Sequence, residues 1–187
     1  MRVIAGTYRS RVLKSLKGPA LRPTSDRLRE TLFNVLGPAV TGSRFLDLFA
    51  GTGAVGIEAL SRGASEVVFV ENHGPAASLI RRNLETLGIS SAAKVLCIDA
   101  ARGLEKLVAK HQAKDPPFDF VFVDPPYAAV QEYAKVLDFL GETVLLRPGS
   151  IVIMEHRRTF SLADSVGNLV RTRVLRQGDA ALSFFRV

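Results

Sequence analysis

The sequence RFLDLFAGTGAVGIEALSRG, residues 44–63, is the clearest indication of the fold of this chain. It joins a short apolar run to a loop with three glycines, and then to a segment of helical periodicity that stops at Gly63. Four more short runs of β-branched or aromatic residues follow, separated by helical stretches, at 66–71, 94–98, 118–123 and 150–155. Strands that alternate with helices predict an α/β fold, in which a mostly parallel sheet carries helices on both faces.

The last twenty residues have a different pattern. Residues 169–176 and 181–187 have the composition of two strands, and Gly178-Asp179 lies between them as a turn signal. This arrangement predicts an antiparallel hairpin at one edge of the sheet.

The first forty residues are also set apart from the alternation. Val3-Ile4 and Val12-Leu13 have the pattern of a small hairpin, and a helix is expected from about Ser25 to Leu36. We therefore expect an appendage of residues 1–40, made of a hairpin and a helix, and a main domain of residues 41–187.

The composition limits the classes of protein to which this chain can belong. The 187 residues are 47% hydrophobic and 23% charged, which fits one globular domain and excludes a disordered or fibrous chain. No apolar run approaches the ~18 residues of a membrane span, and arginines interrupt the first residues, so we expect a cytoplasmic protein. Cys97 is the only cysteine and lies in an apolar run, where we expect it to be buried. The three histidines show no metal-ligand spacing, so no metal is expected.

The net charge of +7 is confined to one end of the chain. Residues 1–29 hold eight basic residues against Asp26 alone, whereas residues 30–187 hold seventeen of each sign. A local basic excess on a neutral body is typical of a segment that binds a polyanion, although a solvated basic face would look the same. The candidates for RNA contact in this segment are Arg9, Arg11 and Lys14.

The glycine loop predicts a nucleoside cofactor. Residues 51–56, GTGAVG, match G-x-G-x-x-G between a strand and a helix, and Glu71 follows Gly51 by twenty residues at the end of the next strand. Glycines let backbone amides approach a ligand, and a carboxylate at that strand end can bind two ribose hydroxyls. The pattern alone fits NAD, another adenosine cofactor, or a turn whose glycines only permit tight packing.

Asp47 and Asp99 favour S-adenosylmethionine among these possibilities. An acidic side chain just before the loop would face a pyrophosphate with like charge, whereas it suits a ligand with an ammonium and a sulfonium group. Asp99 ends the third predicted strand, where it can accept a hydrogen bond from an adenine amino group.

The tetrapeptide Asp124-Pro125-Pro126-Tyr127 follows the fourth predicted strand. The two proline rings restrain the backbone, so that the Asp124 carboxylate and the Pro125 carbonyl can both serve as acceptors for one exocyclic amino group. Hydrogen bonds to both amine hydrogens localise the lone pair and stabilise the charge that develops during attack. Tyr127 offers a face on which an unstacked base can lie. An ordinary turn at the end of a strand remains the alternative.

The chain resembles a known family through these motifs. The segments 47–60, 69–72, 97–100 and 124–127 look like class I S-adenosylmethionine-dependent methyltransferases of exocyclic amines. The opening RVIAGTYRSRVLKSL, the stretch RPTSDRLRETLFNVL (22–36) and the ending GDAALSFFRV narrow the resemblance to the RsmD family, the bacterial 16S ribosomal RNA guanine-N2 methyltransferases. The resemblance implies a Rossmann-like, seven-stranded sheet with a reversed last strand, and an N-terminal segment that helps to grip RNA.

The resemblance also implies roles for individual residues. Transferred onto this sequence, the roles are as follows: Asp47, Gly51 and Gly53 border the methionine moiety, with Thr24 and Asp26 near it; Glu71 binds the ribose and Asp99 the adenine; Asp124, Pro125 and Tyr127 hold the guanine. Gln177 and Ala180 stand where the family is expected to have a tyrosine and a threonine, so the contacts of the terminal hairpin are expected to differ.

Three alternatives stay open at this point. A methyltransferase of another purine amine, such as DNA adenine, would use the same tetrapeptide, but 187 residues leave little room for a target-recognition insertion. The others are an NAD-dependent dehydrogenase and a non-catalytic RNA-binding domain. The expected partner is 16S ribosomal RNA, either naked or within an assembling small subunit, and the protein is expected to be a monomer.

Overall fold

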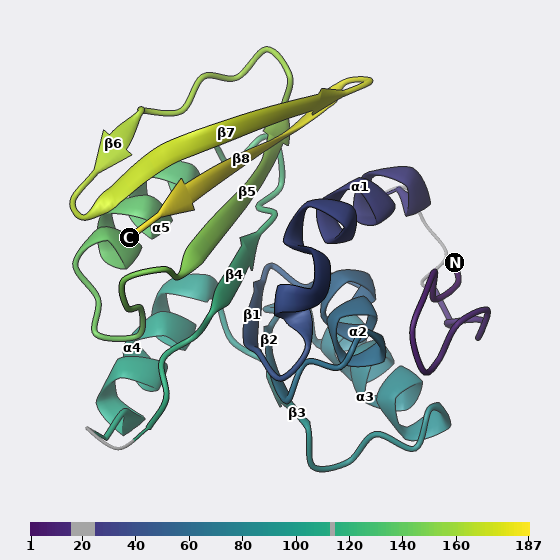
Figure 1. Ribbon diagram of the computed structural model, residues 1–187. Helices are drawn as coiled ribbons and strands as arrows, with labels where there is room; N and C mark the ends of the chain where they lie inside the picture. Colours follow the sequence, from purple (N-terminus) through teal and green to yellow (C-terminus); the bar gives the residue numbers. More distant parts are fainter. Residues whose placement is uncertain (16–24, 113–114) are drawn as a thin grey trace.

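An eight-stranded sheet organises the computed structural model, which describes residues 1–15, 25–112 and 115–187 (Figure 1). The strands are β1 (Arg44–Leu48), β2 (Glu66–Val70), β3 (Ala93–Leu96), β4 (Phe120–Val123), β5 (Ile151–Arg157), β6 (Ser165–Val166), β7 (Leu169–Gln177) and β8 (Ala180–Arg186). Their order across the sheet is β3-β2-β1-β4-β5-β8-β7-β6. The first five strands in this order are parallel and the pairings of β8, β7 and β6 are antiparallel, which confirms the predicted sheet and terminal hairpin.

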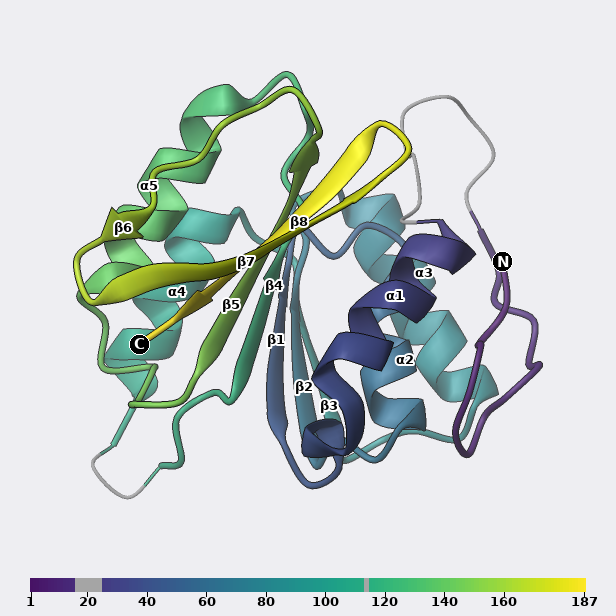
Figure 2. The same ribbon diagram turned by 45° about the horizontal axis from the view of Figure 1, so that its top comes forward.

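Helices cover both faces of the sheet, as predicted (Figure 2). They are α1 (Asp26–Leu36), the short 3-10 helix η1 (Gly37–Val40), α2 (Ala54–Ser61), α3 (Gly74–Thr86), α4 (Ala100–Lys110) and α5 (Val130–Gly141). The hydrophobic core is divided in two by the sheet: α1, α2 and α3 pack on one face, and α4 and α5 pack on the other. No helix in the described part of the chain is long and apolar enough to span a bilayer.

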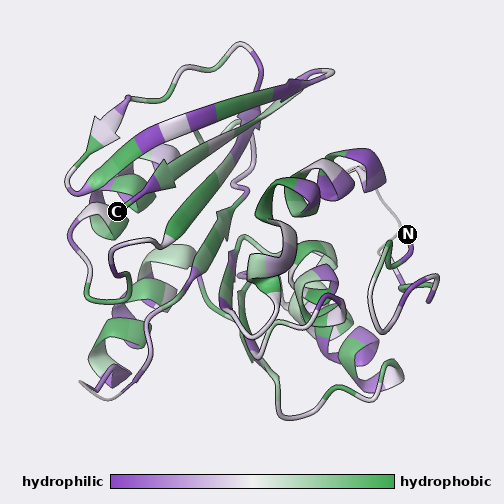
Figure 3. Cartoon of the chain, in the orientation of Figure 1, coloured by the Kyte–Doolittle hydropathy of each residue, from purple (hydrophilic) through white to green (hydrophobic). Residues whose placement is uncertain are grey.

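The hydropathy of the strands follows their place in the sheet. All four residues of β4 are buried, because β4 lies in the centre and has helices on both sides. In β7, which lies near an edge, buried and exposed residues are mixed, and Figure 3 shows this as bands of hydrophilic and hydrophobic colour. Near-continuous apolar runs are typical of central parallel strands, and mixed runs are typical of antiparallel edges.

Three details differ from the sequence-based expectations. The prediction that Cys97 is buried is wrong: β3 ends at Leu96, so Cys97 lies beyond the strand and is exposed. The two-residue strand β6 was not predicted, because a pair of residues carries no periodicity, and it takes the outermost position next to β7. The hairpin expected near the N-terminus is present only as a single bridge between Arg2 and Val12, with flanking backbone hydrogen bonds.

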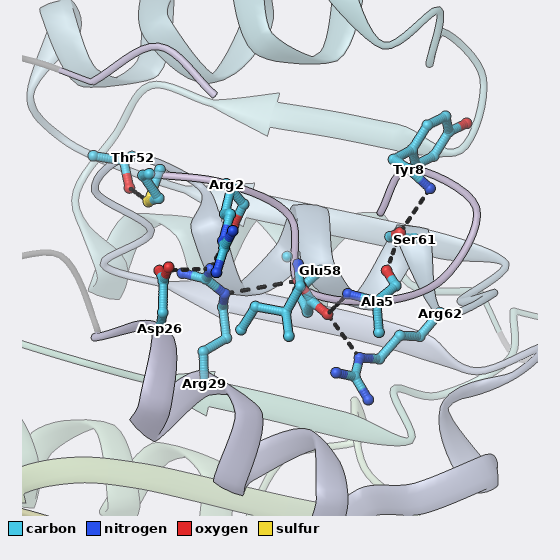
Figure 4. A network of polar contacts seen from close by, with 12 residues as sticks. Arg2, Ala5, Tyr8, Asp26, Arg29, Thr52, Glu58, Ser61 and Arg62 are labelled. Carbon is cyan, nitrogen blue, oxygen red and sulfur yellow. Dashed lines mark hydrogen bonds and ion pairs between the residues drawn. The ribbon is translucent and has the colours of Figure 1, made fainter. Parts of the chain in front are cut away.

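A buried ionic network ties the first residues to helices α1 and α2 (Figure 4). The Glu58 carboxylate on α2 accepts hydrogen bonds from the backbone N–H groups of Ile4 (2.8 Å) and Ala5 (3.0 Å). Arg29 of α1 is fully buried, donates to the Arg2 carbonyl oxygen at 2.7 Å, and lies 3.8 Å from the Glu58 carboxylate. The N-terminal residues, α1 and α2 are therefore joined by groups that are costly to separate.

Helix α1 begins and ends at clear signals. The Ser25 hydroxyl accepts from the Leu28 N–H at 3.1 Å, which caps the first turn, and Gly37 adopts a positive φ of 57° after the last residue. Between these ends, Leu32 and Phe33 are fully buried in the same cluster as Phe45 of β1. The helix therefore contributes to the core of the sheet.

This packing predicts a large effect of truncating Phe33. Phe33→Ala should lower the free energy of unfolding by about 3–5 kcal/mol, because an aromatic side chain that stacks on Phe45 is replaced by a cavity. Asn34→Ala, at an exposed position of the same helix, should change it by less than about 0.5 kcal/mol. Urea unfolding of the three proteins measures both values. Equal stability of Phe33→Ala and the unmodified protein would show that α1 does not belong to the core.

Candidate active site

The glycine loop lies where the helices change from one face of the sheet to the other. Helix α2 follows β1 on one face, whereas α5 follows the neighbouring strand β4 on the opposite face. In open α/β sheets, ligands bind at the carboxyl ends of the strands on either side of such a switch point. The loop after β1 and the tetrapeptide after β4 are therefore placed side by side at the position where a ligand is expected.

Two of the three glycines shape the loop and the third serves packing. Gly51 and Gly53 have φ angles of 53° and 74°, in the left-handed region that favours glycine. Gly56 lies inside α2, where an added Cβ would come within 2.3 Å of a Phe69 ring carbon on β2. Gly56 therefore lets the helix lie close to the sheet, and Gly51 and Gly53 turn the backbone at the ligand edge.

Glu71 anchors the loop from the neighbouring strand. It follows β2, it is buried, and its two carboxylate oxygens accept hydrogen bonds from the N–H groups of Gly51 and His73, both at 2.7 Å. The structure thus brings Glu71 to the glycine loop, as the spacing of the two motifs suggests. A carboxylate oxygen has two lone pairs, so each oxygen retains capacity for a ligand hydroxyl.

Asp47 lies beneath the loop and does not face outward. It is buried, and its carboxyl group accepts a hydrogen bond from the Gly56 N–H at 2.9 Å. Burial raises the pKa of Asp47 to about 8, the hydrogen bond from Gly56 opposes that rise, and the nearby charge of Glu71 adds to it. The sequence predicts that Asp47 borders the methionine moiety of the cofactor, and this contact stays a prediction. In the structure the carboxyl group holds the first turn of α2 through Gly56, and a pKa of about 8 favours its protonated form at neutral pH.

Asp99 caps the next helix at the same edge. It follows β3, and its side chain accepts from the Arg102 N–H at 3.0 Å and lies 3.6 Å from the Arg102 Nε atom. About half of its side chain remains exposed. Since β3 pairs with β2, Asp99 and Glu71 belong to adjacent strand ends, and contact between Asp99 and an adenine ring stays a prediction.

The tetrapeptide is positioned by the pairing of β4 with β1. Val123 is in register with Leu48, and the Asp124 N–H donates to the Leu48 carbonyl oxygen at 3.3 Å. Asp124 and Tyr127 are half-buried, and Pro125 is buried between them. The Pro126 carbonyl oxygen then accepts from the Ala129 N–H at 2.7 Å, which closes a turn before α5. The four residues are thereby fixed close to the start of the glycine loop.

Three residues that the sequence analysis missed surround this tetrapeptide. Tyr133 of α5 is buried, and its hydroxyl has no hydrogen-bond partner within the described residues. Burial and the charge of Asp124 raise the pKa of Tyr133. Glu155 is buried near the end of β5, and the Arg157 guanidinium carbon lies 5.2 Å from the centre of the Tyr127 ring. For Glu155 and Arg157, the signal in the sequence is the run IVIMEHR, which places polar residues at the end of a fifth strand.

The basic candidates of the N-terminal segment lie elsewhere, along α2 and α3. Arg9, Arg11 and Lys14 are all exposed. The backbone nearby is fixed by a hydrogen bond from the Thr7 N–H to the Ser61 carbonyl oxygen and by two hydrogen bonds between Lys14 and the Asn83 side chain. Asp26 begins α1, where Arg29 binds it at 3.0 Å. Thr24 lies outside the described residues.

Together, this sheet order, the glycine loop after β1 and the acidic end of β2 have the arrangement of a class I methyltransferase fold. Comparison with known proteins makes the assignment more specific. The model of the family described as Conserved hypothetical protein 95 matches residues 1–186, so the chain belongs to that family.

Relatives and solved structures agree with this assignment. The chain is 37% identical over 186 residues to protein YlbH of Bacillus subtilis (strain 168), covering 100% of this chain and 98% of the relative. It is 39% identical over 155 residues to the ribosomal RNA small subunit methyltransferase D of Haemophilus influenzae, covering 83% of this chain and 78% of the relative. The structure of yhhF from Escherichia coli has a TM-score of 0.81 and 32% identity, over 100% of this chain and 97% of the other.

The raised pKa of Asp47 predicts a particular pH dependence of stability. Between the unfolded pKa near 3.8 and the folded pKa of about 8, the folded state binds more protons, so the free energy of unfolding falls as the pH rises through that window. The slope from this group should be of the order of 1 kcal/mol per pH unit. Asp47→Asn should lose this contribution.

Urea unfolding at pH 5, 6, 7 and 8 measures the difference between the two proteins. Burial lowers the pKa of His156, but its contribution is shared by both proteins and cancels in the difference. A difference that stays constant from pH 5 to pH 8 would mean that Asp47 titrates below this range.

Proposed function

We propose that the protein transfers a methyl group from S-adenosylmethionine to the exocyclic N2 amine of a guanine in 16S ribosomal RNA. The observation that carries this proposal is the position of Asp124-Pro125-Pro126-Tyr127, which the pairing of β4 with β1 fixes beside the glycine loop. The relationship to a ribosomal RNA small subunit methyltransferase supports the substrate class. Resemblance to the RsmD family assigns guanine, because the tetrapeptide suits either purine amine.

The groups at the carboxyl edge fit S-adenosylmethionine. Gly51 and Gly53 turn the backbone at this edge with positive φ angles, and Glu71 presents a carboxylate, already fixed by two N–H groups, to ribose hydroxyls. Asp99, at the end of the outer strand β3, has a half-exposed carboxylate that suits an adenine amino group. Asp47 supports this site by accepting a hydrogen bond from Gly56, and we expect it to border the methionine moiety of the cofactor. When bound, the cofactor supplies a methyl group on a sulfonium, which is a good leaving group.

The protein's own contribution is to hold the target amine in line with the bond between the methyl group and the sulfur of the cofactor. The Asp124 carboxylate and the Pro125 carbonyl oxygen accept the two amine hydrogens, which returns the nitrogen lone pair to the attacking position and stabilises the positive charge that develops there. Tyr127 stacks on the base and fixes its plane. Positioning of this kind can contribute about 7–11 kcal/mol to the rate, so a covalent catalyst is not required.

The basic N-terminal segment binds the RNA at a distance from the reacting base. Arg9, Arg11 and Lys14 are exposed on a backbone that Ser61 and Asn83 fix to α2 and α3. A firmly held segment loses less conformational entropy when it binds a phosphate backbone than a free tail would. This geometry supports a binding surface rather than a solvated tail.

Substitution of Asp124 tests the reaction. Purified protein is incubated with S-adenosylmethionine and small-subunit ribosomal RNA, either naked or in subunits, from cells that lack the enzyme, and the nucleosides are identified by mass spectrometry. N2-methylguanosine is the expected product. Asp124→Ala should lower the rate by about 100-fold or more while cofactor affinity stays within a few-fold, and Asp124→Asn, which keeps one acceptor, should retain part of the rate.

Methylated adenosine as the product would contradict the assignment of guanine. A normal rate for Asp124→Ala would mean that this residue only forms the turn. The cofactor affinity of each variant, measured by calorimetry, separates these outcomes from misfolding.

A second test addresses the basic segment. Changing Arg9, Arg11 and Lys14 together to glutamine should weaken RNA binding and flatten its log–log dependence on salt by roughly 0.7–0.9 for each phosphate that the protein no longer neutralises. The control removes the same charge from the exposed residues Arg102, Lys106 and Lys110 of α4. Equal salt slopes for the two triple variants would show that the N-terminal segment has no special role in binding.

A further inference from the structure

Arg157 lies on the aromatic ring that the target base is expected to use. Its guanidinium carbon is 5.2 Å from the centre of the Tyr127 ring, within the range of a cation–π contact. Tyr127 comes from the loop after β4, and Arg157 is the last residue of β5. The two strands are parallel neighbours, with Val123 opposite Met154, so this contact joins two adjacent strand ends.

The backbone of Arg157 is fixed, but its side chain is exposed. Arg157 pairs with Ala180 across β8, and the next residue, Arg158, donates its N–H to the Asp179 carbonyl oxygen at 2.8 Å. The long side chain of Arg157 is exposed to solvent beyond this anchored backbone. It can therefore change its position without disturbing the sheet.

The charge of Arg157 also matters for the approach of RNA. Asp124 and Glu155 place two acidic residues at the ends of β4 and β5, and an acidic edge disfavours a phosphate backbone. Arg157 lies close enough to act on these acidic residues. The charges of Asp124 and Glu155 raise the pKa of Tyr133, and the positive charge of Arg157 lowers it. Arg157 thus offers a flat cationic group for stacking, and its positive charge offsets the negative charges of Asp124 and Glu155 at the ends of β4 and β5.

We propose that Arg157 is a substrate-binding residue: it covers the Tyr127 ring in the free protein and, when the target guanine enters, moves outward and stacks on the opposite face of the base. Arg157 has to move outward for this, because a base does not fit between two groups that are 5.2 Å apart. Guanidinium planes stack on unstacked RNA bases in the same manner as aromatic rings do. This inference rests on the proposed function, in which Tyr127 receives the base.

The test compares three variants in methylation of small-subunit ribosomal RNA, used in the form, naked or in subunits, that the unmodified protein methylates. Arg157→Ala should raise KM for the RNA about 10-fold and leave the affinity for the cofactor unchanged. Arg157→Lys keeps the charge but lacks the planar group, so it should recover less than half of that loss. Arg158→Ala removes the same charge from the neighbouring exposed position and should change KM by less than 2-fold.

A stacking readout completes the test. RNA with the fluorescent base 2-aminopurine at the target position should be less quenched when bound to Arg157→Ala than when bound to the unmodified protein, because one stacking face is missing. Full recovery of KM in Arg157→Lys, or equal quenching in the two proteins, would overturn the proposal. If the unmodified protein methylates no RNA guanine, the proposed function itself fails. A Tyr127→Leu variant that loses quenching while Arg157→Ala keeps it would refute the role of Arg157 alone.

Discussion

The turn after β1 depends on two carboxyl groups that accept backbone hydrogen bonds from it. Glu71 accepts from Gly51 at the start of the loop, and Asp47 accepts from Gly56 in the first turn of α2. A tight loop at the end of a buried strand leaves N–H groups that cannot reach water, and these groups need internal partners. The two side chains supply those partners from adjacent strands, so the shape of the loop is set by the pairing of β1 with β2.

The parallel sheet extends this constraint to the rest of the site. With β1 between β2 and β4, the loop after β1 is flanked by Glu71 on one side and by the Asp124 tetrapeptide on the other. A nucleoside held at the first position and a purine amine held at the second would lie close together. The reversed strands β8 and β7 then fix the end of β5, which places Glu155 and Arg157 beside the tetrapeptide.

Local patterns predicted most of the fold and most of the motif positions. The strand and helix alternation, the hairpin at the C-terminus and the start of α1 at Ser25 all follow from periodicity and capping signals over a few residues. The role of Asp47 could not be predicted this way, because its burial depends on α2 packing over it. Arg157 was missed for a similar reason: its contact with Tyr127 arises from the pairing of strands that are distant in sequence. The burial of Arg29 against Glu58 likewise joins two helices that no local pattern connects.

We expect the loop after β1 and Glu71 to form a site for S-adenosylmethionine and not for a dinucleotide. Titration calorimetry of the unmodified protein and Glu71→Gln, with S-adenosylhomocysteine and with NAD, measures this preference. We expect S-adenosylhomocysteine to bind the unmodified protein and to bind at least 10-fold more weakly to Glu71→Gln. A neutral amide is a poorer partner for two ribose hydroxyls, and its NH2 group cannot accept from the N–H of Gly51 or His73. Neither protein should bind NAD. Binding of NAD without any response to S-adenosylhomocysteine would contradict this expectation.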